Sequence, residues 1–481
     1  MPQAMQTTVA NLDGETAPRA PAPVAAILIA GGLLAAISVE PLLIIAAFAT
    51  LAFIVQALWR PGEPPVLLFV LCFQWVQVTT KLLYCSYLGV SLADYSHAEE
   101  IIQALALSLI GLTVLSAGIA IVTRNYHVDV EQMSQRFSQI STVRAFQLYV
   151  AASIVSSFLV GIAYQAPSLT QPLLALAQVK WVAFFVFACS SLVQHKSSGL
   201  LMAAIGLEVV IGVTGFFSDF KQVLFIGFIA ALTARSRVSA WGAVFIAILV
   251  AASISIAVVW SAVKPQYRSY LNQGTDSQTV VVVDIEDRLT TLGNLIMAQD
   301  GESLGKGAEA LVMRLGYIDY FSYALRFVPA YEPHTDGAMW QAALAHVFMP
   351  RVLFPDKEAL PNDSYITMRY TGVRVRGENT SVSVGYMAEN YIDFAVPGMF
   401  VSVFILGCVF GLLYTNILNH LPTLFAYPAA VVSLIPASSF ETALPKIVGS
   451  VVMTFIVMKI LLTFAAPRLE AYLHAEAAPS E

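Results

Sequence analysis

Charge is scarce in this chain of 481 residues. Only 12% of the residues are Asp, Glu, Lys or Arg, and 58% are hydrophobic, whereas ordinary soluble proteins have about 25% charged and roughly 45–50% apolar residues. This composition excludes an ordinary soluble globular enzyme. The 25 basic residues do not outnumber the 31 acidic ones, so the surplus of positive charge that binds a phosphate backbone is absent. We therefore expect no nucleic-acid partner.

Cysteine and the common catalytic motifs are also scarce. The four cysteines all lie in apolar runs, and the chain has neither a CxxC pair nor a Cys/His cluster at zinc spacing. It has no P-loop, GxGxxG or HExxH motif either. These absences give no support to ATP-driven transport or to a standard zinc hydrolase, and we expect no cofactor and no metal.

Long apolar stretches dominate what is present. A helix needs about 17 to 25 residues to cross a bilayer core, and stretches of roughly this length recur along the chain. The sequence predicts an all-α polytopic membrane protein with about 12 transmembrane helices. We place them near 22–38, 41–58, 65–86, 99–122, 144–164, 172–193, 199–216, 220–234, 238–262, 395–418, 423–440 and 446–465.

The basic residues of the short loops indicate the orientation. Lys and Arg gather on the cytoplasmic side. With the N-terminus inside, nine basic residues fall in or beside the cytoplasmic short loops and tails, and two, Lys221 and Lys446, fall in the outer ones. This predicts cytoplasmic tails at 1–21 and 467–481, a bundle of about nine spans over 22–263 and about three further spans over 391–466.

The remaining segment, 264–390, has a soluble-like composition and is predicted to be one large helical periplasmic loop. Its aromatic and branched residues argue against disorder, and a loop of this length is typically functional. We expect a helix over 306–328. A second helix is expected over 337–348, with Asp336 as its N-cap and its end before Pro350.

Ionisable and polar groups inside spans are costly and therefore informative. Lys180 and Glu208 lie at similar depth in neighbouring spans, which predicts an ion pair with a structural role. Gln74, Gln77 and Lys81 share one helical face. That stripe is expected to face the bundle interior, where it either lines a cavity or joins helices by hydrogen bonds.

The end of the large loop resembles the signature of a known family. The stretch FMPRVLFPDKEAL (348–360), followed by NTSVSVGYMAENYIDFAVPGMFVSVFILGCVFGLL (379–413), is similar to the oligosaccharide repeat-unit polymerases, the Wzy-type enzymes of bacterial O-antigen and exopolysaccharide assembly. The chain departs from that pattern at Glu358, where proline is common, and at Ala395, where a glycine is usual.

The resemblance implies transfer of a growing glycan from undecaprenyl pyrophosphate to a lipid-linked acceptor repeat on the periplasmic face. Such a reaction needs cations for the leaving pyrophosphate and a base for the acceptor hydroxyl. The planar guanidinium groups of arginine and the charge of lysine suit the binding of pyrophosphate. Alternatively, the same cations form a solvated surface on which they pair with the acidic residues of the loop. The candidates for pyrophosphate binding are Arg351, Lys357, Arg314 and Arg326.

Glu389 is the candidate base, because it precedes a span at the expected outer interface. Alternatively, Glu389 has a structural role, either as an acidic residue at the start of a helix or as the ion-pair partner of an arginine. The reserve candidates are Asp319, Asp393 and His346.

The implied partners are undecaprenyl-pyrophosphate-linked oligosaccharides, membrane lipid, a chain-length regulator and a repeat-unit flippase, in the bacterial inner membrane with both termini cytoplasmic. Two other functions stay open at this point. One is an O-antigen-ligase-like glycosyltransferase with the same donor. The other is a transporter or flippase of an anionic glycolipid, although the paired broken helices typical of transporters are not evident.

The orientation gives a direct test. A topology reporter fused near residue 130 should be active only in the cytoplasm, and one fused near residue 300 only in the periplasm, because the basic loops stay inside. Finding residue 300 in the cytoplasm would remove the donor assignment, since the lipid-linked substrate is expected on the outer face.

Overall fold

The protein is described by a computed structural model over residues 21–60, 63–126, 130–166, 168–214, 220–234, 240–271, 284–349, 354, 356, 361–374 and 382–474. Within these ranges every regular element is a helix and no strand occurs, which confirms the all-α class. The helices before the large loop are α1 (Pro21–Ile37), α2 (Pro41–Leu58), α3 (Val66–Leu88), η1 (Leu92–Asp94), α4 (Ala98–Thr123), α5 (Val130–Ser138), α6 (Thr142–Gln165), α7 (Thr170–Ala177), α8 (Val179–Gln194), α9 (Ser198–Thr214), α10 (Phe220–Ala234) and α11 (Ala240–Leu271).

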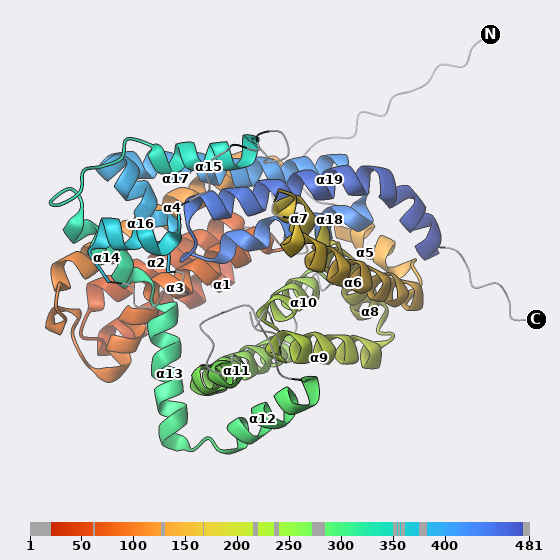
Figure 1. Cartoon of the computed structure of the whole chain (residues 1–481), viewed down its shortest axis with the longest axis horizontal. Coiled ribbons are helices and arrows are strands. Elements are labelled where there is room, and N and C mark those ends of the chain that lie inside the picture. The colour runs from red at the N-terminus through yellow and green to blue at the C-terminus, as the bar shows by residue number, and fades with distance from the viewer. Residues whose placement is uncertain are drawn as a thin grey trace, which may run out of the picture.

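The later helices include five in the segment predicted to be the large loop. They are α12 (Ile285–Met297), α13 (Gly301–Leu315), α14 (Ile318–Phe327), α15 (Ala338–Phe348) and α16 (Asp363–Thr371), followed by α17 (Tyr386–His420), α18 (Thr423–Leu434), η2 (Ile435–Ser438) and α19 (Leu444–His474). In Figure 1, α15, α17 and α19 run along one edge of the molecule, α9, α11 and α12 lie at the opposite edge, and α13 runs between the two groups.

Seven helices in the described ranges are long and apolar enough to cross a membrane: α2, α3, α4, α6, α7 with α8, α17 and α19. Shorter apolar helices lie at Ala22–Ile37, Ser198–Gly212, Lys221–Ala234 and Leu424–Ser438. Each stretch predicted to be a span falls on a helix. Length and composition therefore fit a membrane protein, while the count of twelve spans stays a prediction.

Two expectations for the large loop need correction. The helix expected over 306–328 is two helices that break at Gly316, because α13 packs on α11 whereas α14 packs on α4. Glycine is poorly suited to a helix interior and well suited to such a break. The helix expected over 337–348 is present as α15, but Asp336 is not its N-cap: that position is Gly337, which makes no capping side-chain bond.

Helices α4 and α17 approach each other so closely that two glycines are required. A Cβ on Gly118 would lie 2.5 Å from the Phe404 carbonyl oxygen, and a Cβ on Gly407 would lie 2.4 Å from the Leu115 carbonyl oxygen. Small residues allow this kind of backbone contact where lipid supplies no hydrophobic driving force between helices. The first half of the chain is thereby joined to the helix that carries the family-like motif.

The predicted ion pair inside the bundle is confirmed. Lys180 Nζ lies 2.9 Å from Glu208 Oε2, and the Tyr149 hydroxyl donates to Glu208 Oε1 at 2.7 Å. The stripe on α3 also faces inward as expected, with Gln74 and Gln77 buried. Each of these buried polar side chains has a partner on another helix or segment, which offsets the cost of burying polar groups in an apolar protein.

Helix α17 is interrupted two residues after Asp393. Ala395 has φ 53° and ψ −167°, inside what is otherwise a helix. This is backbone space that glycine occupies readily and that strains an L-residue with a side chain. Ala395 therefore adopts a backbone conformation typical of glycine although it carries a side chain.

This strain predicts the effect of a single substitution. Ala395→Gly should raise the thermal midpoint of the purified protein in detergent, because it relieves roughly 1 kcal/mol or more of backbone strain. The matched control, Ala342→Gly within the regular helix α15, should lower the free energy of unfolding by about 1 kcal/mol and so lower the thermal midpoint. Equal losses in both variants would mean that Ala395 is not strained.

Candidate functional site

Two carboxylates on α17, one helical turn apart, each cap another helix. Glu389 is 3% exposed, and its Oε2 accepts a hydrogen bond at 2.5 Å from the backbone N–H of Leu444, the first residue of α19. The N-terminus of a helix has unsatisfied N–H groups and a positive end of the dipole, which favour a carboxylate. Glu389 therefore positions the start of α19.

Asp393 does the same for α15. It is fully buried and accepts hydrogen bonds from the backbone N–H groups of Met339 and Trp340, both at 3.0 Å, and from the Thr335 hydroxyl at 2.5 Å. This contact replaces the cap expected from Asp336. A residue 54 positions away in sequence supplies it, which explains why local sequence did not reveal it.

The segment 435–444, between α18 and α19, is fixed by α3 as well. The Gln74 side-chain amide donates to the Ala437 carbonyl at 2.6 Å, and the Gln77 side-chain carbonyl accepts from the Phe440 N–H at 2.9 Å. The Tyr386 hydroxyl donates to Gln74 at 2.7 Å. Of the two roles left open for the stripe, Gln74 and Gln77 thus perform the joining of segments.

A cavity of about 370 Å³ lies against this segment. Its lining comes from α7 and the residue after it, the start of α10, segment 435–444 and α19, and includes three amides, Gln171, Gln178 and Gln222, with three serines and one threonine. Lys221 is the one ionisable group among the described residues of the lining. All these positions belong to the ends of predicted spans that the predicted topology assigns to the same side of the membrane.

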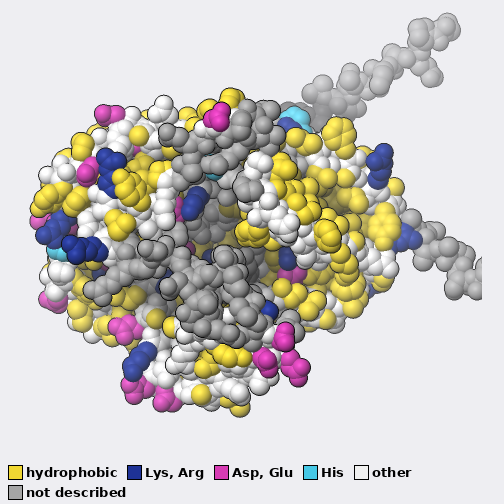
Figure 2. Space-filling model, in the orientation of Figure 1, with side chains coloured by type: hydrophobic (Ala, Val, Ile, Leu, Met, Phe, Trp, Pro, Cys, Tyr) yellow, Lys and Arg dark blue, Asp and Glu magenta, His cyan; other side chains and the backbone are white. Residues whose placement is uncertain are grey.

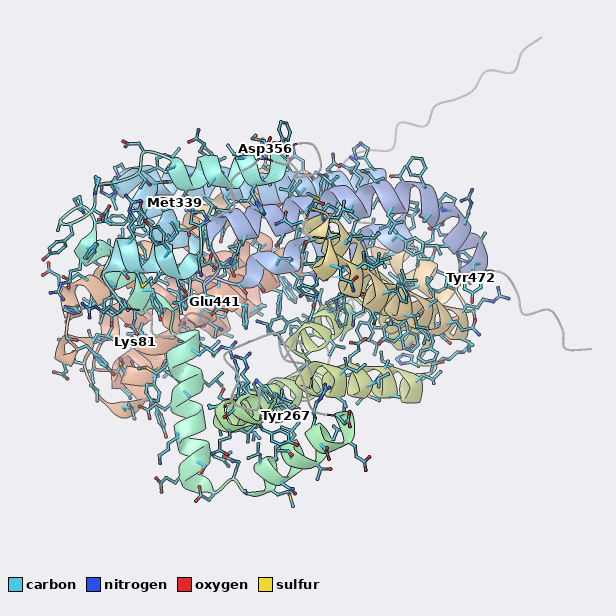
Figure 3. The ribbon with its side chains drawn as sticks, in the orientation of Figure 1. Lys81, Tyr267, Met339, Asp356, Glu441 and Tyr472 are labelled. Carbon is cyan, nitrogen blue, oxygen red and sulfur yellow. The ribbon has the colours of Figure 1, made fainter. Side chains whose placement is uncertain are left out.

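Lys221 also belongs to a group of basic residues beside the cavity. Lys264 and Arg268, on α11, interact electrostatically with Arg314 at the end of α13, and Lys264 also with Lys221. We call Lys221, Lys264, Arg268 and Arg314 the cationic cluster. Figure 3 places Glu441 near the end of α13 that carries Arg314, and Figure 2 shows basic side chains at the edge of the central hollow of this face.

Close helix packing holds the cluster together. A Cβ on Gly307 of α13 would lie 2.7 Å from the Val258 carbonyl oxygen of α11, so the two helices are in backbone contact just before their basic ends.

Among the described residues, the charges that act on Lys264 and Arg268 are mainly positive. Burial, and after it the nearby Arg314, Arg268 and Lys221, lower the pKa of Lys264 to about 8, while Glu441 acts in the opposite direction. Lys264 lies beyond the predicted span 238–262. Burial and Arg314 likewise lower the pKa of Arg268. An anion that entered here would relieve the repulsion.

The candidates named from sequence are dispersed. Arg314 belongs to the cationic cluster, whereas Arg326 contacts the His97 ring at the other end of α14, at 2.5 Å. Asp319 forms an ion pair with Lys81. Arg351 and Lys357 lie outside the described residues.

His346 is the reserve candidate that lies at the cavity. Its ring contacts the Gln171 amide, and a Cβ on Gly449 would lie 2.6 Å from it; both neighbours line the cavity. No group of three or more His, Cys, Asp or Glu residues suited to a metal ion occurs in the part of the chain that the structure describes.

Sequence reasoning missed Lys221, Lys264, Arg268 and Glu441 as members of one site. The signal available was the four-residue spacing of Lys264 and Arg268, which puts both on one face of a helix. The spacing does not point to a shared helical face if the span ends at residue 262, before Pro265, as the sequence predicts. In the structure, α11 continues through Pro265 to Leu271.

Comparison with known proteins gives one match. The family model described as "Domain of unknown function (DUF8712)" matches residues 63–466. No curated protein and no solved structure matches the chain.

The pKa of Lys264 predicts how anion binding depends on pH. Below about pH 8 the lysine is charged and attracts an anion; as the pH rises through 8 it becomes neutral and that attraction is lost. Inorganic pyrophosphate should therefore bind the wild-type protein about 3- to 10-fold more weakly, relative to Lys264→Arg, at about pH 9.5 than at about pH 7. Comparing the wild-type protein with Lys264→Arg removes the effect of the ionisation of pyrophosphate, which is the same for both proteins. If the two proteins showed identical pH profiles of binding, Lys264 would not belong to the site.

Proposed function

The chain belongs to the DUF8712 family, a family of unknown function, and we propose that it is a membrane glycosyltransferase that uses a lipid-pyrophosphate donor. The observation that carries the proposal is the cationic cluster beside a polar cavity in a bundle of apolar helices. A lipid-linked sugar pyrophosphate has three matching parts: an apolar chain, a double phosphate and a hydroxyl-rich sugar.

The reaction we propose is polymerisation of undecaprenyl-pyrophosphate-linked repeat units for O-antigen or exopolysaccharide. The acceptor hydroxyl attacks the anomeric carbon of the donor glycan, and the bond from that carbon to the pyrophosphate oxygen breaks. The electron pair leaves on undecaprenyl pyrophosphate, and the hydroxyl proton passes to a base. The motif similarity of 348–360 and 379–413 supports polymerisation, and we assign the protein to the bacterial inner membrane with both termini cytoplasmic.

The cationic cluster would hold the leaving pyrophosphate. Arg314 and Arg268 offer planar forks that bind phosphate oxygens two at a time, and the lysines offer point charges. Their charges act on the oxygen where negative charge develops, which is the position at which electrostatic stabilisation accelerates a reaction. Arg351 and Lys357, from the motif itself, are proposed to complete this site.

The base is proposed to be His346, with Glu389 in a positioning role. Glu389 is almost fully buried and one of its oxygens caps α19, whereas the ring of His346 contacts residues that line the cavity. Histidine is also the most frequent general base in enzymes. Glu389 remains the alternative base, because its other oxygen is not used in the cap.

Two substitutions separate these roles. His346→Gln should lower the rate of polymerisation about 10²- to 10⁴-fold in a purified assay with lipid-linked repeat units. Glu389→Gln retains a carbonyl oxygen that can accept the Leu444 N–H and should keep most of the activity. The reverse pattern would make Glu389 the base.

The assay also tests the function itself. If the unaltered protein formed no glycosidic bond while labelled glycolipid crossed the bilayer, the protein would be a transporter and the polymerase proposal would be wrong.

A further inference from the structure

The cavity has a lining that phosphate binding does not require. Among the described residues of the lining, the polar groups apart from Lys221 are uncharged: three amides, three serine hydroxyls and one threonine hydroxyl, with no carboxylate. Amides and hydroxyls both donate and accept hydrogen bonds. That combination matches a ligand whose own groups are hydroxyls or acetamides.

Two of the amides are held in fixed positions. The Gln222 side-chain nitrogen donates to the Gln178 side-chain oxygen at 3.0 Å, and the Gln178 nitrogen lies 3.5 Å from the Leu174 carbonyl. Among the described residues the Gln222 side-chain oxygen has no hydrogen-bond donor. The pair therefore joins α10 to the residue between α7 and α8, and still offers an acceptor to a ligand.

Phe225 adds an apolar face to the same cavity. Its ring is fixed edge-on against Phe69 and Phe73, with centroid distances of 4.9 and 5.0 Å. A rigid aromatic face beside hydrogen-bonding groups suits a sugar ring, which has apolar C–H faces and polar edges. The volume of about 370 Å³ is near the lower end of ligand pockets, so the cavity has room for a single sugar rather than a long glycan.

Lys221 connects this cavity to the cationic cluster. It lines the cavity and interacts electrostatically with Lys264. A ligand that occupies both the cavity and the cationic cluster would therefore need an anionic group directly beside a polar, uncharged group. In a lipid-linked donor the sugar attached to the pyrophosphate has this arrangement.

We propose that the cavity is the subsite for the sugar joined directly to the donor pyrophosphate, and that Gln178 and Gln222 determine which sugar is accepted. This inference rests on the proposed lipid-pyrophosphate donor and adds the residues that determine its specificity. Lys221 lies at the junction, where the bond between sugar and phosphate would be placed.

The test compares soluble donor analogues on the purified full-length protein. The probes are farnesyl pyrophosphate and a panel of farnesyl pyrophosphates carrying glucose, galactose, N-acetylglucosamine or N-acetylgalactosamine. At least one sugar-bearing probe should bind about tenfold or more tightly than farnesyl pyrophosphate. Gln222→Leu should reduce that ratio about 3- to 10-fold, the effect of one lost ligand hydrogen bond, and leave the affinity for farnesyl pyrophosphate unchanged.

Two controls make the result specific. Gln103→Leu, on the exposed side of α4, should leave the ratio unchanged. Lys264→Gln should weaken all the probes by a similar factor, because it acts on the pyrophosphate.

The proposal is overturned if no sugar on the panel increases affinity, or if Gln222→Leu leaves the ratio intact. The proposed function fails separately. Protein that forms no glycosidic bond but keeps a Gln222-dependent sugar preference would retain the subsite and lose the polymerase assignment. If a Gln222→Leu protein polymerised normally and kept the same sugar preference, the polymerase assignment would stand and the subsite proposal would be wrong.

Discussion

The burial of two carboxylates on one helix is the constraint on which the site depends. Glu389 and Asp393 are both buried in a protein with few charges, and each is satisfied mainly by the N-terminal N–H groups of another helix. A buried carboxylate without such partners is strongly unfavourable. The two caps therefore fix where α19 and α15 begin relative to α17, and with them segment 435–444 and His346, which border the cavity.

Hydrophobic patterning predicted the parts of the fold that depend on local sequence. Helices lie under every predicted span, and the Lys180–Glu208 pair was expected because both residues lie at the same depth of neighbouring spans. The break at Gly316 was not expected, since it results from α13 and α14 packing on different helices. The cap of α15 was also missed, because Asp393 reaches it only after the chain has folded. Periodicity reports on one helix at a time and carries no information on such distant contacts.

The sequence selected candidate residues by their chemistry, and packing decides which of them meet. Of the cations chosen near the expected membrane surface, Arg314 lies in the cationic cluster. Arg326, chosen on the same grounds, contacts His97 instead, since fold-level packing decides which of many arginines meet. The cavity amides could not have been singled out, because glutamine in an apolar span has the same pattern whether it joins helices, as Gln74 does, or borders an open space, as Gln222 does.

The contact at Gly307 has a consequence for how the basic side chains respond to a ligand. Because α11 and α13 are in backbone contact there, helix packing itself brings Lys264, Arg268 and Arg314 near one another. Their mutual repulsion is overcome when the chain folds. A site of this kind is preorganised for an anion: its binding would need little reorganisation of the protein and would reduce the repulsion among the basic side chains.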